Sequence, residues 1–303
     1  MHPHAPVGFD PDDLDEAADV VVVNYNGRDQ LATSLPVWDE FRAAGYISDI
    51  IVVDNASGDG SVQFLRREYP SAVLVENDEN LGWGVAVNHG FDAASADQVF
   101  VATPDMIPTE SWCHTLQTYL DANEQVGLAT GIVMRPSGRV DSRGAIANGL
   151  FRFDTAPSSD EIQAVDAGRG SALLVRRDAF ESVNGIDSDL FIQGGDINLS
   201  LKLKEGGWHL SFVPGALVWH CEPLSPGTSL PYYNTRNLYL LAARHLSTAD
   251  FLRVVALNAC LHLVGSTVQF LLGRRSGAEL SSVWRGVSEG FRLAAVERFR
   301  AED

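Results

Sequence analysis

Short runs of apolar, mostly β-branched residues alternate with helical stretches between residue 19 and about residue 105. Each run is continuously apolar, which is typical of a strand that is buried on both faces of a sheet. The helical stretches can serve as crossovers, so the strands are expected to lie parallel. The sequence therefore predicts an α/β fold with a mainly parallel central sheet flanked by helices. The runs are DVVVVN, DIIVVD, AVLVE and DQVFVA, with helices expected over about 28–44, 60–68 and 82–94.

Polar side chains follow these runs. Asn24, Asp54, Asn80 and Asp105 each lie just past the carboxyl end of a run or in the turn after it. In open α/β sheets the ligand crevice lies at that edge. Four polar residues placed in this way predict a polar ligand that lies across the sheet.

Charge and cysteine usage limit the class of protein. The formal net charge of −18 makes nucleic acid an unfavourable partner. The three cysteines are scattered, without the spacing of a disulfide framework or a zinc site, which fits a reducing compartment. The acidic first residues lack the apolar core of a signal peptide. We expect residues 1–18 to be a disordered acidic lead-in, and the protein to be cytoplasmic.

From residue 236 the sequence is helical and carries nine arginines against six acidic residues. A basic region on an acidic body fits an anionic membrane surface, and it also fits solvated helices. The uncharged run over 254–273 is long enough to span a bilayer. A polar stripe at near-helical spacing favours an amphipathic helix, either packed on the domain or lying in the membrane interface. The stripe consists of Asn258, His262, Ser266 and Gln269.

Two phosphate-binding motifs are missing. GWGVAVNHG begins like a dinucleotide fingerprint but has Val87 in place of the third glycine, and it follows the third apolar run, not the first. No Gly-rich phosphate loop ending in Lys-Ser or Lys-Thr occurs. A dinucleotide or P-loop fold is therefore excluded as the basis of function.

Eight stretches resemble, in the same order, the inverting family-two glycosyltransferases of the GT-A fold, close to their rhamnosyltransferase-like branch. The resemblance extends from about residue 20 to about 245, and it implies a GT-A catalytic domain over 19–235 with a helical C-terminal extension over 236–303. The stretches are VVVNYNGRDQLATSL, IIVVDNASGDGSV, ENLGWGVAVNHG, VATPDMIP, GSALLVRRDAFESVNGID, LFIQGGDINLSLKLKEGGW, VWHCE and YYNTRNLYLLAAR.

The resemblance implies a set of donor-binding residues. Asp54 would bond the edge of the nucleotide base, and Arg236 could reach phosphate. Asp54 with its neighbours also fits a plain turn that caps the next helix, so both interpretations stay open here. The full implied donor-binding set is Asn24, Tyr25, Asn26, Asp54, Asn80, Gly82, Gly84 and Arg236.

TPDMIP stands where relatives carry a metal-binding motif, and only its final acid, Asp105, is retained. The resemblance implies that Asp105 and His220 hold Mg²⁺ or Mn²⁺, which would neutralise the diphosphate leaving group. Thr103 replaces the first polar residue of the motif. Taken alone, Pro104-Asp105 also fits a turn, and a single histidine after an apolar run also fits a structural role.

Asp196 matches the catalytic base, the second acid of a Glu-Asp-x-Asp motif that reads Gly195-Asp196-Ile197-Asn198 here. Inversion requires a carboxylate that takes the proton of the acceptor hydroxyl. A helix N-cap is the competing interpretation. The apolar residues after Asp196 alternate with polar ones, which by period alone indicates a strand. The resemblance predicts a helix instead, and we expect the helix. Trp208 fits a core residue, or an aromatic that stacks on the acceptor sugar.

The resemblance thus predicts transfer of a sugar, with inversion, from dTDP-rhamnose or next a UDP-sugar to a hydroxyl of a glycan. The implied acceptor is a polyprenyl-diphosphate-linked saccharide, used in cell-envelope polysaccharide synthesis at the inner face of the membrane, and a homodimer is a further expectation. Two alternatives stay open. An inactive nucleotide-sugar-binding scaffold would explain Thr103, Gly195 and Asn198. A sugar-phosphate nucleotidyltransferase would need a Gly-rich basic loop after the first run, where NYNGRDQ has one arginine.

Overall fold

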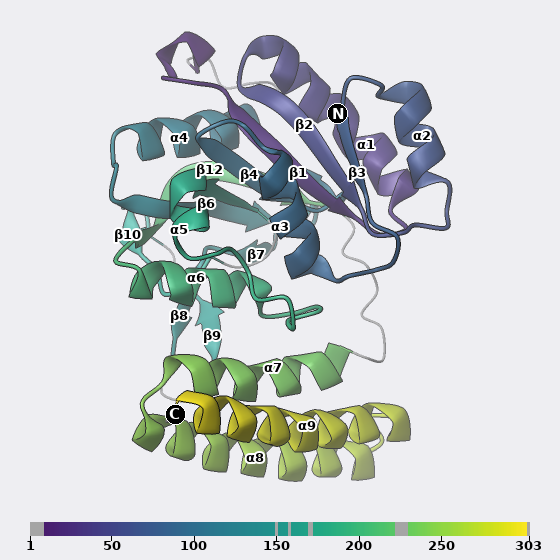
Figure 1. The fold of residues 1–303 in the computed structure, drawn as a ribbon, viewed down its shortest axis with the longest axis vertical. Coiled ribbons are helices and arrows are strands. Elements are labelled where there is room, and N and C mark those ends of the chain that lie inside the picture. The colour runs from purple at the N-terminus through teal and green to yellow at the C-terminus, as the bar shows by residue number, and fades with distance from the viewer. Residues whose placement is uncertain (1–8, 149–150, 157–158, 169–171, 222–229, 302–303) are drawn as a thin grey trace.

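The computed structural model describes residues 9–148, 151–156, 159–168, 172–221 and 230–301 (Figure 1). Its main sheet has eight strands in a continuous path, with β5 (Met106–Ile107) paired to β12 and β7 (Val140–Ser142) paired to β6. In spatial order the path is β10 (Gln163–Ala164), β12 (His209–His220), β6 (Val126–Met134), β11 (Leu173–Arg176), β4 (Gln98–Ala102), β1 (Ala18–Asn24), β2 (Ile47–Asp54) and β3 (Val73–Glu76).

The four strands expected from the apolar runs form one parallel block. β1 pairs in parallel with both β2 and β4, and β2 pairs in parallel with β3. β11 lies antiparallel between β4 and β6, while β12 runs parallel to β6. The prediction of a mainly parallel sheet is confirmed. The register sets Asn24 beside Asp54, so the polar residues that end β1 and β2 are neighbours.

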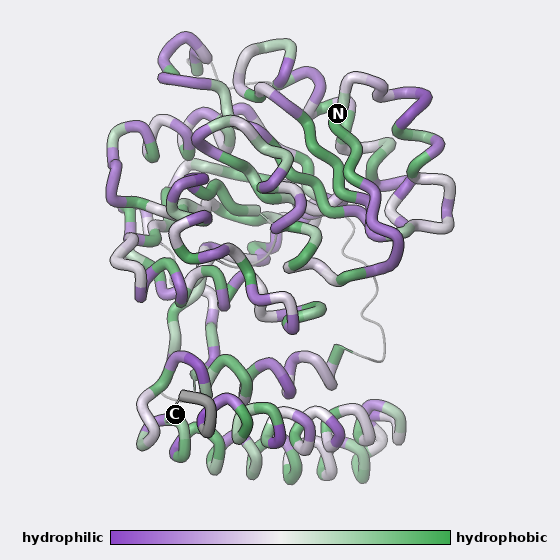
Figure 2. Tube along the Cα trace, viewed as in Figure 1, coloured by the Kyte–Doolittle hydropathy of each residue, from purple (hydrophilic) through white to green (hydrophobic). Residues whose placement is uncertain are grey.

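Helices cover both faces of this sheet. Successive residues of a strand point to opposite sides, so one strand contributes side chains to two cores. Val20 and Val22 of β1 belong to one core, and Val21 and Val23 belong to the other. The first core is closed by α1 (Arg28–Ala44), α2 (Ser61–Glu68) and α4 (Glu110–Asp121). The second is closed by α3 (Trp83–Ala93), α5 (Arg177–Ser182) and α6 (Gly195–Glu205). The strands at the centre of Figure 2 are green, which marks their residues as hydrophobic.

Three further helices form a layer at one end of the molecule (Figure 1). They are α7 (Leu230–His245), α8 (Thr248–Leu271) and α9 (Gly277–Ala301), and they share a core that includes Tyr239 and Val287. A two-stranded sheet of β8 (Ala145–Ala147) and β9 (Phe153–Thr155) lies between this layer and the main domain. The helical region expected from 236 is present, and its first described helix already begins at Leu230.

The polar stripe of α8 faces the protein over most of its length, whereas Gln269 at its end is exposed. Asn258 is 0% exposed and Ser266 is 5% exposed. On the other side of the helix, large apolar side chains are exposed, including Leu257, Val264 and Leu271. Green segments along the outer edge of the layer in Figure 2 follow this pattern. By length and composition α8 could cross a membrane, and it is the one helix among the described residues that meets this criterion.

Of the expected lead-in, residues 1–8 lie outside the described residues. The remainder contains a short 3-10 helix, η1 (Pro11–Asp13), which Asp10 caps by accepting a hydrogen bond from the backbone N–H of Asp12. The backbone carbonyl of Phe9 accepts a hydrogen bond from the hydroxyl of Tyr46 at 3.2 Å. This segment therefore lies against the main domain.

Candidate active site

A cavity of about 440 Å³ lies at the carboxyl ends of β1, β2, β4 and β12, the edge that the sequence predicted. Residues from widely separated parts of the chain line it, because parallel strands end at a common edge. Six of the residues expected from the sequence lie on its wall, namely Tyr25, Asn80, Gly82, Asp105, Asp196 and His220.

Asp105 and His220 face each other in this cavity. His220 Nε2 lies 2.9 Å from Asp105 Oδ2, and His220 Nδ1 lies 2.7 Å from Asp141 Oδ2. Thr103 donates its hydroxyl hydrogen to Asp105 Oδ1 at 2.6 Å. Burial alone would lower the pKa of His220, but the hydrogen bonds to Asp105 and Asp141 hold that pKa above its usual range. Arg135 pairs with Asp141 at 2.9 Å, so a line of contacts runs from Asp105 through His220 and Asp141 to Arg135.

This pair fits a divalent cation in its donor chemistry. Asp105 offers a carboxylate, and His220 would offer Nε2 after loss of the proton that this nitrogen donates to Asp105, while Asp141 holds the other ring nitrogen as a carboxylate commonly does behind a metal-bound histidine. Among the described residues no group of three or more His, Cys, Asp or Glu side chains could hold a metal alone. Mg²⁺ usually keeps several waters and takes substrate phosphate oxygens as well. Two protein ligands are therefore enough for such a shared site.

Asp196 is the second residue of α6, so the prediction of a helix after Gly195 is confirmed. The N-cap position is held by Gly194, which has φ 84°, and the N-cap interpretation of Asp196 is therefore wrong. Asp196 Oδ1 accepts a hydrogen bond from the N–H of Ile197 at 2.9 Å. Its carboxylate lines the active-site cavity at the positive end of the helix dipole.

The two neutral residues of the modified motif have structural partners. A Cβ atom at Gly195 would lie 3.0 Å from the ring of Trp83, so a larger residue there would push against that indole. Asn198 is fully buried, donates to Asp187 Oδ2 at 2.9 Å and accepts from the backbone N–H of Asp187 at 2.9 Å. These residues fix α6 against its surroundings, where relatives carry acids.

Asn24 and Asp54 bond to each other and are buried, outside the cavity lining. Asn24 Nδ2 donates to Asp54 Oδ2 at 2.7 Å and to Ser57 Oγ at 3.1 Å. Asp54 Oδ1 accepts from the N–H of Ser57 at 2.8 Å. Asn26 Oδ1 accepts a hydrogen bond from the N–H of Gly58 at 2.8 Å, so it connects the turn after β1 to the turn after β2. The group forms a rigid platform next to the cavity.

Besides Asn24, Asn26 and Asp54, three more expected residues do not line the cavity. Gly84 packs in α3, where a Cβ would lie 2.7 Å from Ile186 Cγ2. Arg236 on α7 donates to the carbonyl of Asp189 at 3.0 Å. Trp208 follows the far end of α6 and lines a separate cavity, with its indole N–H donating to Ser182 Oγ at 3.1 Å. Trp208 therefore lies outside the wall of the cavity that Asp196 lines, and its predicted stacking on an acceptor sugar has no support in the structure.

Sequence reasoning missed Asp141, Trp83, Phe191 and Gln193. Asp141 is the middle residue of the short strand β7, in the stretch SGRVDSRG, which carries no periodic signal. Phe191 and Gln193 come directly before the two glycines that open α6, and their backbone and side chains form the cavity wall. Only Trp83, which stands between two glycines in GWG, offered a local cue.

The arrangement of strands and helices is the GT-A fold. The structure is similar to that of GalNAc-T7 with UDP, GalNAc and Mn²⁺, with a TM-score of 0.61 and 16% identity over 76% of this chain and 50% of that chain. It is also similar to the mannosyltransferase PcManGT from Pyrobaculum calidifontis in complex with GDP-Man and Mn²⁺. That match has a TM-score of 0.59 and 20% identity, and covers 100% of this chain and 92% of the other.

Within that fold class, the chain belongs to glycosyl transferase family 2, whose sequence model matches residues 19–183. It is 30% identical over 237 residues to the N-acetylglucosaminyl-diphospho-decaprenol L-rhamnosyltransferase of Mycobacterium tuberculosis, covering 67% of this chain and 74% of that protein. It is 24% identical to the glycosyltransferase AglE of Haloferax volcanii over 59% of this chain and 57% of that protein. The chain is therefore a glycosyltransferase.

Proposed function

We propose that this glycosyltransferase transfers a sugar from a nucleotide diphosphate donor to a hydroxyl of a lipid-linked glycan, with inversion. The observation that carries the proposal is the meeting of Asp105, His220 and Asp196 in one cavity. The name of the mycobacterial relative supports dTDP-rhamnose as the first donor to test and a diphospho-polyprenol saccharide as the acceptor. A UDP-sugar is the second donor.

Tyr25, Asn80 and Gly82 form the part of the wall that we assign to the donor nucleotide. Asn80 Oδ1 already accepts from the N–H of Gly82 at 3.0 Å, so this wall is held in place before a ligand arrives. Asp54 stays the predicted partner of the base, and its hydrogen bonds to Asn24 and Ser57 would orient its carboxylate. A preformed wall lowers the entropy that donor binding must overcome.

Asp105 and His220 would hold Mg²⁺ or Mn²⁺ together with the donor phosphates. Such an ion would offset the negative charge that develops on the leaving diphosphate. Asp141 keeps the His220 ring oriented from behind, through the 2.7 Å contact with Nδ1. Thr103 orients Asp105 in the same manner. These contacts assign Thr103 a supporting role, although it replaces a polar motif residue.

Asp196 is the proposed general base. It lines the active-site cavity and also a second cavity of about 250 Å³, so it stands where donor and acceptor would meet. Its carboxylate would accept the proton of the acceptor hydroxyl as the oxygen attacks the anomeric carbon. Because a single displacement occurs from the side opposite the leaving group, the configuration inverts.

The outer face of α8 supports a location at a membrane surface. Leu257, Val264 and Leu271 are exposed on it, and the exposed Arg253 and Arg274 lie near its two ends. Apolar side chains flanked by arginines suit the interface of an anionic bilayer. A peripheral position there would bring the enzyme to a lipid-linked acceptor.

Asp196→Asn tests the base with a matched control. Asp178 is likewise the second residue of its helix, α5, and likewise accepts through Oδ1 from the N–H of the following residue. We expect Asp196→Asn to lower turnover by a factor of about 100 or more, while Asp178→Asn leaves it nearly unchanged. Both variants should lose similar, small amounts of stability. Near-normal turnover in Asp196→Asn would remove the assignment.

Titration of dTDP and UDP, each with and without Mn²⁺, tests the donor site. Asp105→Ala should remove most of the Mn²⁺-dependent gain in nucleotide affinity, whereas Asp196→Asn should keep it within a few-fold. Nucleotide binding that is indifferent to Mn²⁺ would contradict the metal assignment. Metal-dependent binding without turnover across a donor panel would favour the scaffold alternative.

A further inference from the structure

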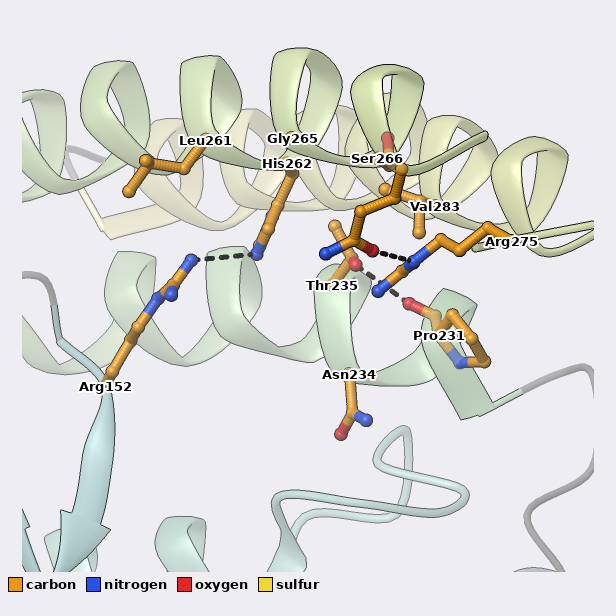
Figure 3. A pocket seen from close by; sticks show the side chains of 11 residues that line it. Arg152, Pro231, Asn234, Thr235, Leu261, His262, Gly265, Ser266, Arg275 and Val283 are labelled. Atoms are coloured by element: carbon orange, nitrogen blue, oxygen red, sulfur yellow. Dashed lines mark hydrogen bonds between the residues drawn. The ribbon is translucent and has the colours of Figure 1, made fainter. Parts of the chain in front are cut away.

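A cationic cavity of about 420 Å³ lies between α7 and α8 (Figure 3). Arg152 enters it from the residue before β9, and His262 and Arg275 enter it from α8 and the turn after it. The other lining residues are polar or apolar and none is acidic. In a chain of net charge −18, a cavity with two arginines and no acid is an unusual concentration of positive charge.

Neither arginine forms an ion pair with a described carboxylate. Arg152 donates from Nε to Asn258 Oδ1 at 3.1 Å and lies 3.3 Å from His262 Nε2, and Arg275 donates from Nε to Gln269 Oε1 at 2.5 Å. Figure 3 shows both guanidinium groups directed into the space below α8. Guanidinium groups held by neutral partners keep donors for an anion with two or more oxygens.

His262 adds to this chemistry. Burial and the neighbouring Arg152 and Arg275 lower its pKa to about 4, so the ring is neutral near pH 7. Its Nδ1 atom is buried and has no hydrogen-bond partner among the described residues. A buried polar atom without a partner is uncommon in proteins and indicates a site that a ligand or a water completes.

The second cavity lies between the cationic cavity and the active-site cavity. It shares Arg152 and His262 with the cationic cavity, and Gln193 and Asp196 with the active-site cavity. Asn234 and Thr235 of α7 also line both the cationic cavity and the second cavity. Three cavities thus follow one another, from the donor site past Asp196 to α8.

The cationic cavity also borders the exposed apolar face of α8. Leu261 lines the cavity and is 47% exposed, and it lies one helical turn from Leu257 and about one turn from Val264 on that face. Leu261 precedes His262, which Arg152 contacts, so a ligand that extends outward from Arg152 meets apolar side chains.

We propose that Arg152 and Arg275 bind the diphosphate of a lipid-linked acceptor, whose saccharide extends to Asp196 and whose lipid leaves past Leu261. This inference rests on the proposed function for the identity of the acceptor. Its chemistry is an amphiphile with a polar saccharide, a doubly charged linker and an apolar tail, in the order in which the cavities and the α8 face follow one another. A nucleotide donor lacks the apolar tail.

Binding of farnesyl diphosphate, measured by calorimetry in the presence of EDTA, tests the site without any sugar transfer. The chelator removes metal-dependent diphosphate binding at Asp105 and His220. We expect Arg275→Gln and Arg152→Gln to weaken binding by about ten- to a hundredfold, because each removes a charge-assisted contact. Farnesol, which lacks the charge, should bind weakly to every variant. Arg253→Gln on the same helix lies outside the cavity and should bind within about twofold of the parent protein.

Unchanged affinity in Arg275→Gln, or an equal loss in Arg253→Gln, would overturn the inference. Among the described residues, the side chain of Arg275 donates a hydrogen bond to Gln269 alone, so its replacement should disturb the fold little. Arg275→Gln therefore still tests the proposal if Arg152→Gln does not fold. Vesicles of phosphatidylglycerol separate the other source of anionic groups. Equal loss of vesicle binding in Arg275→Gln and Arg253→Gln, with farnesyl diphosphate binding intact, would assign the arginines to the membrane surface instead.

The two proposals can fail separately. Transfer to a neutral glycoside acceptor, together with unaltered farnesyl diphosphate binding in Arg275→Gln, would keep the function and reject the diphosphate site. Selective loss of farnesyl diphosphate binding in a protein that transfers no sugar from any donor would do the opposite. In an active enzyme the variant should raise KM for the diphosphate acceptor and leave kcat and the neutral acceptor unchanged.

Discussion

Substitution of Gly82 by alanine should weaken both the fold and the site. Gly82 has φ 87° and ψ 171°, a conformation that is almost restricted to glycine. A Cβ atom there would lie 2.2 Å from the backbone oxygen of Phe191, which also accepts the N–H of Trp83 at 2.8 Å. The contact is with backbone, so a rotation of a side chain cannot relieve it. The segment that leads to Asp196 would have to move.

The cost follows from two separate effects. The unfavourable backbone conformation costs about 1–3 kcal/mol. Overpacking against Phe191 adds about 1–3 kcal/mol. Together we expect Gly82→Ala to lower the free energy of unfolding by about 4 kcal/mol, a large part of the roughly 5–15 kcal/mol of a typical domain.

Gly138→Ala is the matched control. Gly138 has φ 80°, but a Cβ there would have no atom within 4 Å. This variant should therefore lose only about 1 kcal/mol, from the backbone alone. Urea unfolding of both variants gives the difference. Displacement of the cavity wall should also lower the turnover of Gly82→Ala by about tenfold or more, whereas Gly138→Ala should keep it. If the two variants unfold at the same urea concentration, the steric argument is refuted.

Two further predictions concern charge. Burial, Arg152 and Arg275 lower the pKa of His262 from 6.5 to about 4. The free energy of unfolding should therefore be unaffected by His262 above pH 6.5 and fall by about 1–2 kcal/mol towards pH 4, after allowance for the partial exposure of the ring. In His262→Gln, unfolding measured across that range should show a smaller fall. Arg244→Met should cost about 3 kcal/mol, because this mostly buried side chain pairs with three carboxylates, while Arg292→Met, from an exposed pair, should cost under about 0.5 kcal/mol. Equal losses in the two arginine variants would contradict this ranking.

The parallel block of the sheet could be predicted because its signal is local. The four residues before Asn24 and the four before Asp54 are all apolar, and a strand with helices on both faces requires that pattern. Polar residues at the ends of such runs then converge without further information. The helix after Gly195 was harder, because Leu199 and Leu203 pack in the core at helical spacing while the intervening residues imitate a strand period. Family resemblance decided that case correctly.

The remainder of the site depends on contacts between distant segments. Asp141 reaches His220 across 79 positions, and Arg152 reaches Asn258 across 106. No periodicity connects residues at such separations, and Asp141 and Arg152 lie in or next to strands of only three residues. The polar stripe of α8 shows the same limit. The spacing of α8 predicted that the helix has one polar face. It could not predict that this face points inward, because that orientation depends on contacts with Arg152 and α7.

The neutral residues beside Asp196 argue for a retained site in place of a decayed one. A position that has lost its function drifts without regard to its neighbours, whereas Asn198 is fully buried and exchanges two hydrogen bonds with Asp187. Asp187 also pairs with Lys202 and Arg244, so an acid at 198 would bring a second negative charge against a carboxylate whose partners are already assigned. Gly195 is required in the same sense, because Trp83 occupies the space of its missing side chain. Both substitutions hold α6 where Asp196 faces two cavities, which is the geometry that a base between donor and acceptor needs.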